Sequence, residues 1–98
     1  MSAPLLDYYH ALERTTRQML EAARDERWAA VAESRACCGR QIAELKRAAQ
    51  QQPLTPEQQL ERLQVMRRIV HIEGEVRRLS SPTNHWLDRM FARQPRVA

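Results

Sequence analysis

Residues 55–79 read TPEQQLERLQVMRRIVHIEGEVRRL, and this segment is the most informative part of the chain about its fold. Thr55 and Gln58 lie three residues apart with Pro56 between them, which is the pattern of a capping box with proline at the first helical position. The apolar residues that follow recur at steps of three and four, as they do on one face of a helix. We therefore predict a helix from Pro56 to about Leu79, roughly 35 Å long.

This helix carries two apolar stripes, whose centres lie roughly 150° apart at 100° per residue. A helix in a simple two-helix hairpin needs only one apolar face, so the second stripe predicts a further neighbour. That neighbour is the first helix of a three-helix bundle, a fourth helix, another subunit or a bound protein. The first stripe consists of Leu60, Leu63, Met66 and Val70, and the second stripe consists of Val65, Ile69, Ile72, Val76 and Leu79.

Two further helices are predicted upstream of this stretch. The first spans residues 3–24, where apolar side chains return at three- and four-residue steps. The second is expected to begin near Asp25, whose acidic side chain suits a helix N-terminus, and to end before a loop at residues 50–54. Its apolar seam is interrupted by Arg35, whose head is expected either to reach solvent or to contact a partner. The seam consists of Trp28, Val31, Arg35, Cys38, Ile42, Leu45 and Ala49.

The serines, proline and polar residues at 80–84 end the third helix. A fourth helix over about residues 85–93 is too short to be stable alone in water, so it must dock onto another surface. We expect an all-α fold, an antiparallel helical bundle of three long helices plus a short C-terminal helix. Residues 1–79 form the body, and residues 80–98 form a linker and the short helix. The docking face consists of Trp86, Leu87, Met90 and Phe91.

The net charge of +4 is concentrated at the C-terminal end. Residues 77–98 carry five arginines and one aspartate, whereas acidic and basic side chains balance in residues 1–76. The pairs Arg67-Arg68 and Arg77-Arg78 could contact phosphates. No helix-turn-helix, zinc finger or run of stacking aromatics accompanies them, so nucleic acid is not the expected partner.

The location expected from the sequence is the cytoplasm. No stretch approaches the roughly 20 apolar residues that a membrane-spanning helix needs. Residues 1–7 also lack the basic and apolar regions of a signal peptide.

No catalytic, cofactor-binding or metal-ligating residues are predicted, and we expect a protein-binding module rather than an enzyme. Phosphate-binding, dinucleotide-binding and zinc-protease motifs are absent from the sequence. His10, His71 and His85 lie on three different segments. Cys37 and Cys38 are adjacent, which suits neither a disulfide nor a shared metal, and Cys38 is expected to face the core.

Two stretches of this sequence resemble the FliT family of flagellar export chaperones. The first is QMLEAARDERW at residues 18–28, where a leucine and small residues precede an acidic turn and a tryptophan. The second is RIVHIEGEVRRL at residues 68–79, followed by Pro82 and the apolar pairs Trp86-Leu87 and Met90-Phe91. The resemblance covers nearly the whole chain and rests on the order and spacing of these features.

The resemblance implies a four-helix chaperone of the bacterial cytoplasm. Proteins of this family bind the C-terminal region of the filament-cap protein FliD before export. They also contact the export apparatus and, in some bacteria, the FlhDC transcriptional activator. The last helix can cover the client surface and inhibit binding, a regulatory role that would fall to residues 80–98 here. The resemblance assigns docking to Trp86, Leu87, Met90 and Phe91, and the partner-binding groove to Val65, Ile69, Ile72, Val76 and Leu79.

Two other functions are open from the sequence alone. A homodimeric helical module would use the second stripe for self-association, which light scattering would detect. A basic regulator that contacts nucleic acid would stay on heparin at about 0.5 M salt, since weaker phosphate contacts are lost there.

Overall fold

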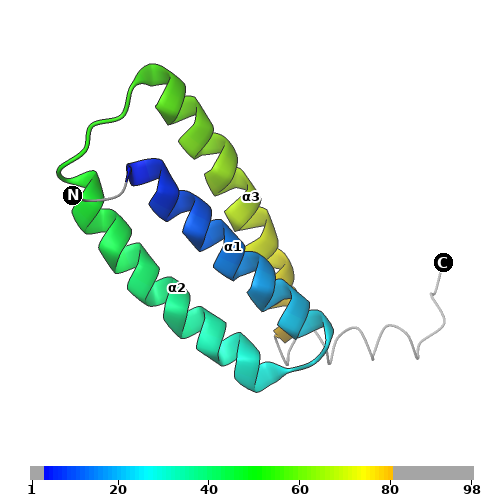
Figure 1. Ribbon diagram of the computed structural model, residues 1–98. Helices are drawn as coiled ribbons and strands as arrows, with labels where there is room; N and C mark the ends of the chain where they lie inside the picture. The colour runs from blue at the N-terminus through cyan, green and yellow to red at the C-terminus, as the bar shows by residue number, and fades with distance from the viewer. Residues whose placement is uncertain (1–3, 81–98) are drawn as a thin grey trace, which may run out of the picture.

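The structure, a computed structural model, describes residues 4–80. Within that range the chain is all-α, with three helices and no strand: α1 (Leu5–Arg24), α2 (Trp28–Ala49) and α3 (Pro56–Ser80). The helices lie side by side as a bundle, with α1 between α2 and α3 (Figure 1). The short helix predicted over residues 85–93 lies outside the described residues.

Helix α1 is the central element of the bundle. It packs along both other helices, whereas α2 and α3 make few contacts with each other. Ten of its twenty residues are therefore buried, including Thr15 and Thr16. Their hydroxyls donate to the carbonyls of Ala11 and Leu12, so these polar groups are satisfied within the helix.

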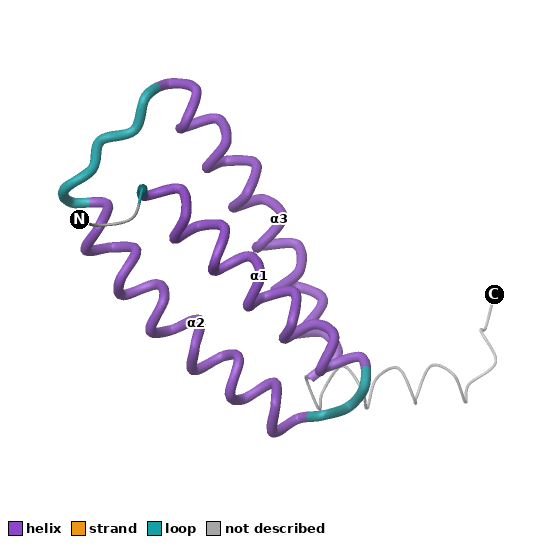
Figure 2. Tube along the Cα trace, in the orientation of Figure 1, coloured by secondary structure: helices purple, strands orange, loops and turns teal. Residues whose placement is uncertain are grey.

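The bundle contains one antiparallel and one parallel helix contact. Helix α2 runs opposite to α1, and α3 runs the same way as α1 (Figure 2). His10 pairs with Glu61 and Arg24 pairs with Glu75, so pairing advances along both helices in the same sense. The predicted antiparallel arrangement therefore does not describe the α1–α3 contact, because the intervening α2 returns the chain to the starting end.

Two apolar clusters make up the core. The turn-end cluster lies near the α1–α2 turn, and the loop-end cluster lies near the loop between α2 and α3. Cys38 packs against both, as its predicted inward position requires. The turn-end cluster consists of Met19, Leu20, Ala22, Ala23, Val31, Ile72 and Val76. The loop-end cluster consists of Leu5, Tyr9, Leu12, Leu45, Val65 and Ile69.

The capping box predicted at the start of α3 is confirmed. The amide of Gln58 donates to Thr55 Oγ1 at 3.2 Å, and the amide of Thr55 donates to Gln58 Oε1 at 2.9 Å. These reciprocal bonds satisfy two donors that a helix N-terminus leaves free. Helix α3 accordingly begins at Pro56, as predicted.

The start of the second helix was predicted wrongly. Asp25 caps the C-terminus of α1, and α2 begins only at Trp28. Glu26 adopts a left-handed conformation with φ of 56°, which takes it out of any helix. The amides of Glu26 and Arg27 donate to the carbonyls of Ala23 and Ala22, which is the Schellman pattern that ends a helix.

The predicted seam of α2 is only partly buried. Val31 and Leu45 are buried and Cys38 is half-buried, but Trp28 and Ile42 are exposed. Because α2 has a single close neighbour, it buries a narrow line of residues rather than the full width of its apolar face.

Candidate partner-binding surface

The first stripe of α3 is exposed. Leu60, Leu63 and Val70 are 63%, 45% and 64% exposed, respectively. Met66 is half-buried and packs against the loop-end cluster. Exposed apolar side chains gathered on one face are a common feature of protein-binding surfaces. The first stripe is therefore the leading candidate for a partner site within residues 4–80.

The second stripe, which was predicted to form the partner-binding groove, packs against α1 instead. Val65 and Val76 have no exposed surface, and Ile69 and Ile72 are also buried. Leu79 is half-buried against the turn-end cluster. These side chains are part of the core and do not form an open surface. Client binding there, or a homodimer through the second stripe, stays a prediction that would require α1 to separate from α3.

Charged side chains beside the second stripe link α3 to α1. Positions 61, 68 and 75 of α3 recur at seven-residue steps, so they lie on one side of the helix. The side chain at each position contacts an oppositely charged side chain or a histidine on α1. The three pairs are His10–Glu61 at 2.8 Å, Glu13–Arg68 at 2.7 Å and Arg24–Glu75 at 3.2 Å.

Glu13 is the buried residue among these three pairs, with a side chain that is 10% exposed. Its carboxylate accepts hydrogen bonds from Arg68 Nε at 2.7 Å and Nη2 at 3.1 Å, and from Arg17 Nη2 at 2.8 Å. The bonds from Arg68, supported by Arg17, hold the pKa of Glu13 at about 2, although burial acts in the opposite direction. The carboxylate is therefore ionised at neutral pH and links α1 to α3.

An apolar hollow of about 410 Å³ lies on the outer face of α3. Leu63, Met66 and Val70 of the first stripe line it, together with Arg67 and His71. These positions follow the three- and four-residue spacing of a single helix face. The hollow is thus an apolar site with one basic edge.

A second hollow of about 390 Å³ lies between α1 and α3. It shares Arg67 and His71 with the apolar hollow, so the two are neighbours on α3. Four arginines line it but only one carboxylate does, and we call it the basic hollow. Its lining consists of Arg17, Leu20, Arg24, Arg67, Arg68, His71, Ile72 and Glu75.

Sequence reasoning missed this combination of surfaces. The signal was present in the four-residue steps from Leu63 to Arg67 to His71, which place two basic side chains beside the first stripe. The contribution of Arg17 and Arg24 depends on how α1 packs against α3, and no spacing within one helix reports that.

The arginine pairs considered for phosphate contact are split by the fold. Arg68 bonds to Glu13, and Arg77 lies 3.7 Å from Glu73. Arg67 forms no ion pair within residues 4–80. Partial neutralisation of the pairs weakens a phosphate site built from all four guanidiniums.

Arg35 reaches across from α2 to α3. Its Nη1 lies 2.9 Å from Glu73 Oε1, so the head makes a contact within this chain. Exposed Trp28 and Ile42 lie seven residues on either side of Arg35, on the same face of α2. They add apolar surface to α2, separate from the hollows described above.

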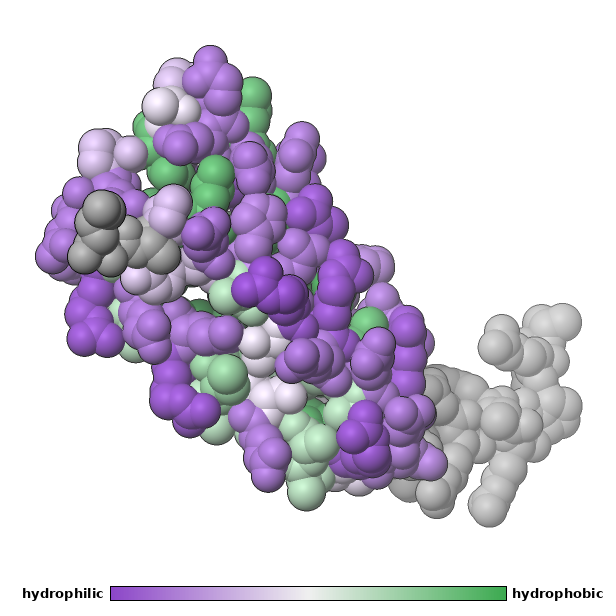
Figure 3. All heavy atoms as spheres, viewed as in Figure 1, coloured by the Kyte–Doolittle hydropathy of each residue, from purple (hydrophilic) through white to green (hydrophobic). Residues whose placement is uncertain are grey.

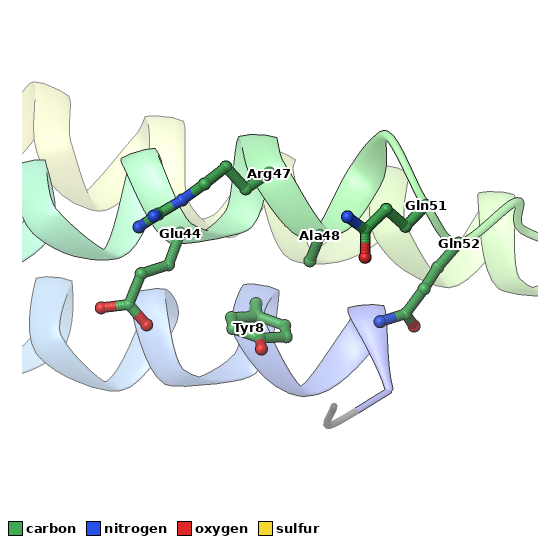
Figure 4. Close-up of a pocket in the computed structure, with 6 residues that line it drawn as sticks. All are labelled: Tyr8, Glu44, Arg47, Ala48, Gln51 and Gln52. Carbon is green, nitrogen blue, oxygen red and sulfur yellow. The ribbon is translucent and has the colours of Figure 1, made fainter. Parts of the chain in front are cut away.

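A third hollow, of about 210 Å³, lies between the N-terminal half of α1 and the C-terminal half of α2 (Figure 4). Tyr8 faces it from α1, whereas Glu44, Arg47 and Ala48 come from α2. Glu44 and Arg47 are exposed to solvent, so this hollow is a notch in the surface with no buried charge to hold a ligand. The face seen in Figure 3 is mostly hydrophilic, with small separate apolar patches.

Residues 4–80 contain no group of three or more His, Cys, Asp or Glu side chains placed to hold a metal ion. His10 and His71 contact Glu61 and Glu75, respectively. Burial raises the pKa of Cys38, which makes its thiol a poorer nucleophile.

The predicted docking residues Trp86, Leu87, Met90 and Phe91, together with His85, lie outside the described residues. Within the described range, no helix is long and apolar enough to cross a membrane.

A family model described as flagellar protein FliT matches residues 6–92, which is most of the chain. No curated protein and no solved structure matches this sequence.

Proposed function

Because the chain belongs to the FliT family of flagellar chaperones, we propose that it binds the C-terminal region of the filament-cap protein FliD in the cytoplasm and delivers it to the export apparatus. The observation that carries this proposal is the exposed first stripe on α3. A chaperone needs a surface for an aggregation-prone client and no covalent chemistry.

The shape of the first stripe favours a helical client. Leu60, Leu63 and Val70 extend over about three turns of α3, which matches the spacing of anchors on an amphipathic helix. A client helix would cover apolar side chains that solvent now contacts, and each apolar side chain buried on both partners would favour binding. The core would not have to open, since the second stripe already packs against α1.

Calorimetric titration with the C-terminal segment of the filament-cap protein from the same organism tests this function. We expect micromolar or tighter binding by the full chain. Val70→Asp should weaken it by at least about tenfold, because the new charge would lose hydration on an apolar interface. Val70 is exposed, so this variant should keep the helicity of the parent protein.

Ala43→Asp on α2 is the matched control, since it places the same charge at an exposed helical position away from the first stripe. It should bind like the parent protein. Absence of binding by the parent chain would refute the chaperone proposal. Equal losses in both variants would show that added charge, rather than the site, is responsible.

The proposal extends to two further roles implied by the family. We propose contact with export apparatus components, and with the FlhDC activator where that activator is present. Co-purification of each protein with the full chain, with Val70→Asp run in parallel, would show whether either partner competes for the first stripe.

The C-terminal segment is proposed to cover the client surface. Replacing Trp86 and Phe91 with alanine in the full chain should then tighten binding of the filament-cap segment, measured by the same titration. Weaker binding by this double variant would instead place Trp86 and Phe91 in the client site.

A further inference from the structure

We infer that the first stripe and the basic hollow act as one composite surface, which selects an amphipathic client helix with carboxylates along one edge of its apolar face. This inference rests on the proposed chaperone function and specifies the chemistry of the client. In this inference, Arg67 and His71 contact the carboxylates along that edge of the client helix.

The continuity of the two hollows is the first support. Arg67 and His71 line both the apolar hollow and the basic hollow. They lie four residues apart on α3, and Leu63 lies four residues before Arg67. A helix seated on the first stripe would therefore have this basic row along one side.

The charge balance is the second support. Arg68 forms an ion pair with Glu13, and Arg24 forms one with Glu75. Arg67 forms no ion pair with a carboxylate within residues 4–80. The four arginines of the basic hollow form ion pairs with only two carboxylates, Glu13 and Glu75, so the hollow is net positive without counting His71. Carboxylates on a partner would complement that charge, speed association and fix the register of the bound helix.

The composite surface favours an acidic helix over a nucleic acid. The apolar hollow contributes Leu63, Met66 and Val70, which have no polar group for a phosphate and no aromatic ring for a base. A phosphate backbone would use only the basic edge and leave these side chains in water. An amphipathic helix would use both parts.

A titration with the C-terminal segment of the filament-cap protein, using the full chain, tests the inference. Arg67→Gln removes the charge while keeping a good helix former, and should weaken binding about threefold at low salt. That difference should vanish at about 0.5 M salt, where exposed charge pairs are screened. Arg40→Gln, an exposed arginine on α2, is the control and should bind like the parent protein at every salt concentration.

A second form of the peptide, with each carboxylate converted to an amide, completes the test. The parent chain should bind this amide peptide more weakly than the acidic peptide. The Arg67→Gln variant should bind both peptides about equally, because the substitution and the amide conversion remove the same interaction. Loss of binding in Val70→Asp with no effect of Arg67→Gln would overturn the acidic-edge inference and leave the chaperone function intact. No binding by the parent chain would overturn both.

Duplex DNA serves as the competing probe. If Arg67→Gln weakens DNA binding and leaves peptide binding unchanged, the basic hollow is a phosphate site and the inference is wrong. If DNA fails to displace the peptide, the acidic-helix assignment stands.

Discussion

Glu13 lies where the apolar face of α1 would otherwise continue. Tyr9, Leu12 and Met19 are buried on the same helix, yet a carboxylate is buried among them. Burial of this charge is tolerated because Arg68 and Arg17 donate three hydrogen bonds to it. One residue thus links the packing of α1 against α3 to the ionisation state of a single group.

The depressed pKa of Glu13 makes stability depend on pH in a stated direction. The folded-state pKa is about 2 and the ordinary value is 4.5, so the unfolded state binds more protons in this window. The stabilisation is complete above about pH 4.5 and is lost as the pH falls toward 2. Urea unfolding at successive pH values should show this loss. The acid-induced loss of stability should be smaller in Glu13→Gln. This substitution should also lower the free energy of unfolding at pH 7 by about 2 kcal/mol.

Glu33→Gln is the control for this prediction, because Glu33 is an exposed carboxylate on α2. Its pH dependence should match that of the parent protein. If Glu13→Gln retains the full acid-induced loss of stability, other carboxylates cause the loss.

At the scale of the elements, the turn between α1 and α2 depends on an unusual residue choice. Glu26 has a φ of 56°, a conformation that glycine adopts without steric cost and other L-residues adopt with strain. The Schellman bonds from Glu26 and Arg27 keep the chain in this turn. Helix α1 therefore ends by local backbone hydrogen bonds without a glycine at the left-handed position.

Glu26→Gly should raise the free energy of unfolding by about 1 kcal/mol, because it relieves the left-handed strain. Glu26→Ala removes the same charge but keeps the Cβ atom, so it should give no comparable gain. Thermal unfolding followed by circular dichroism measures both. An equal gain in the two variants would assign the effect to the charge instead of the backbone.

At the scale of the whole molecule, the two stripes of α3 have opposite environments. Val76 has no exposed surface and packs in the turn-end cluster, whereas Val70 is 64% exposed. The same helix thus holds the bundle together on one side and offers an apolar surface on the other. Substitutions on the outer side should therefore cost little stability.

Paired aspartate substitutions test this division. Val76→Asp should destabilise the protein by at least about 3 kcal/mol, since it buries an unpaired charge, and a domain this small can lose its fold. Val70→Asp should change the unfolding free energy by less than about 1 kcal/mol. Chemical denaturation of both variants gives the comparison. A stable Val76→Asp together with an unfolded Val70→Asp would reverse the assignment of the two faces.

The three helical segments and the start of α3 could be predicted because their causes are local. The capping box at Thr55 and Gln58 sets the start of α3, and the spacing of apolar residues marks its faces. The start of α2 could not be predicted from acidic residues at 25 and 26, because the same residues end α1. The exposure of Trp28 and Ile42 was also missed, since it depends on α2 having only one close neighbour.

Three long helices, and two apolar faces on the third, could be inferred from the sequence because periodicity records which side chains share a face. The resemblance to the FliT family was also visible in the sequence, and the FliT family model matches residues 6–92. Which of the two faces is buried became clear from the packing of α3 against α1. The buried face packs against the apolar face of α1 and is flanked by the pairs Glu13–Arg68 and Arg24–Glu75, contacts between residues more than 50 positions apart. Periodicity within one helix carries no information about such partners, so the sequence could not distinguish the buried face from the exposed one.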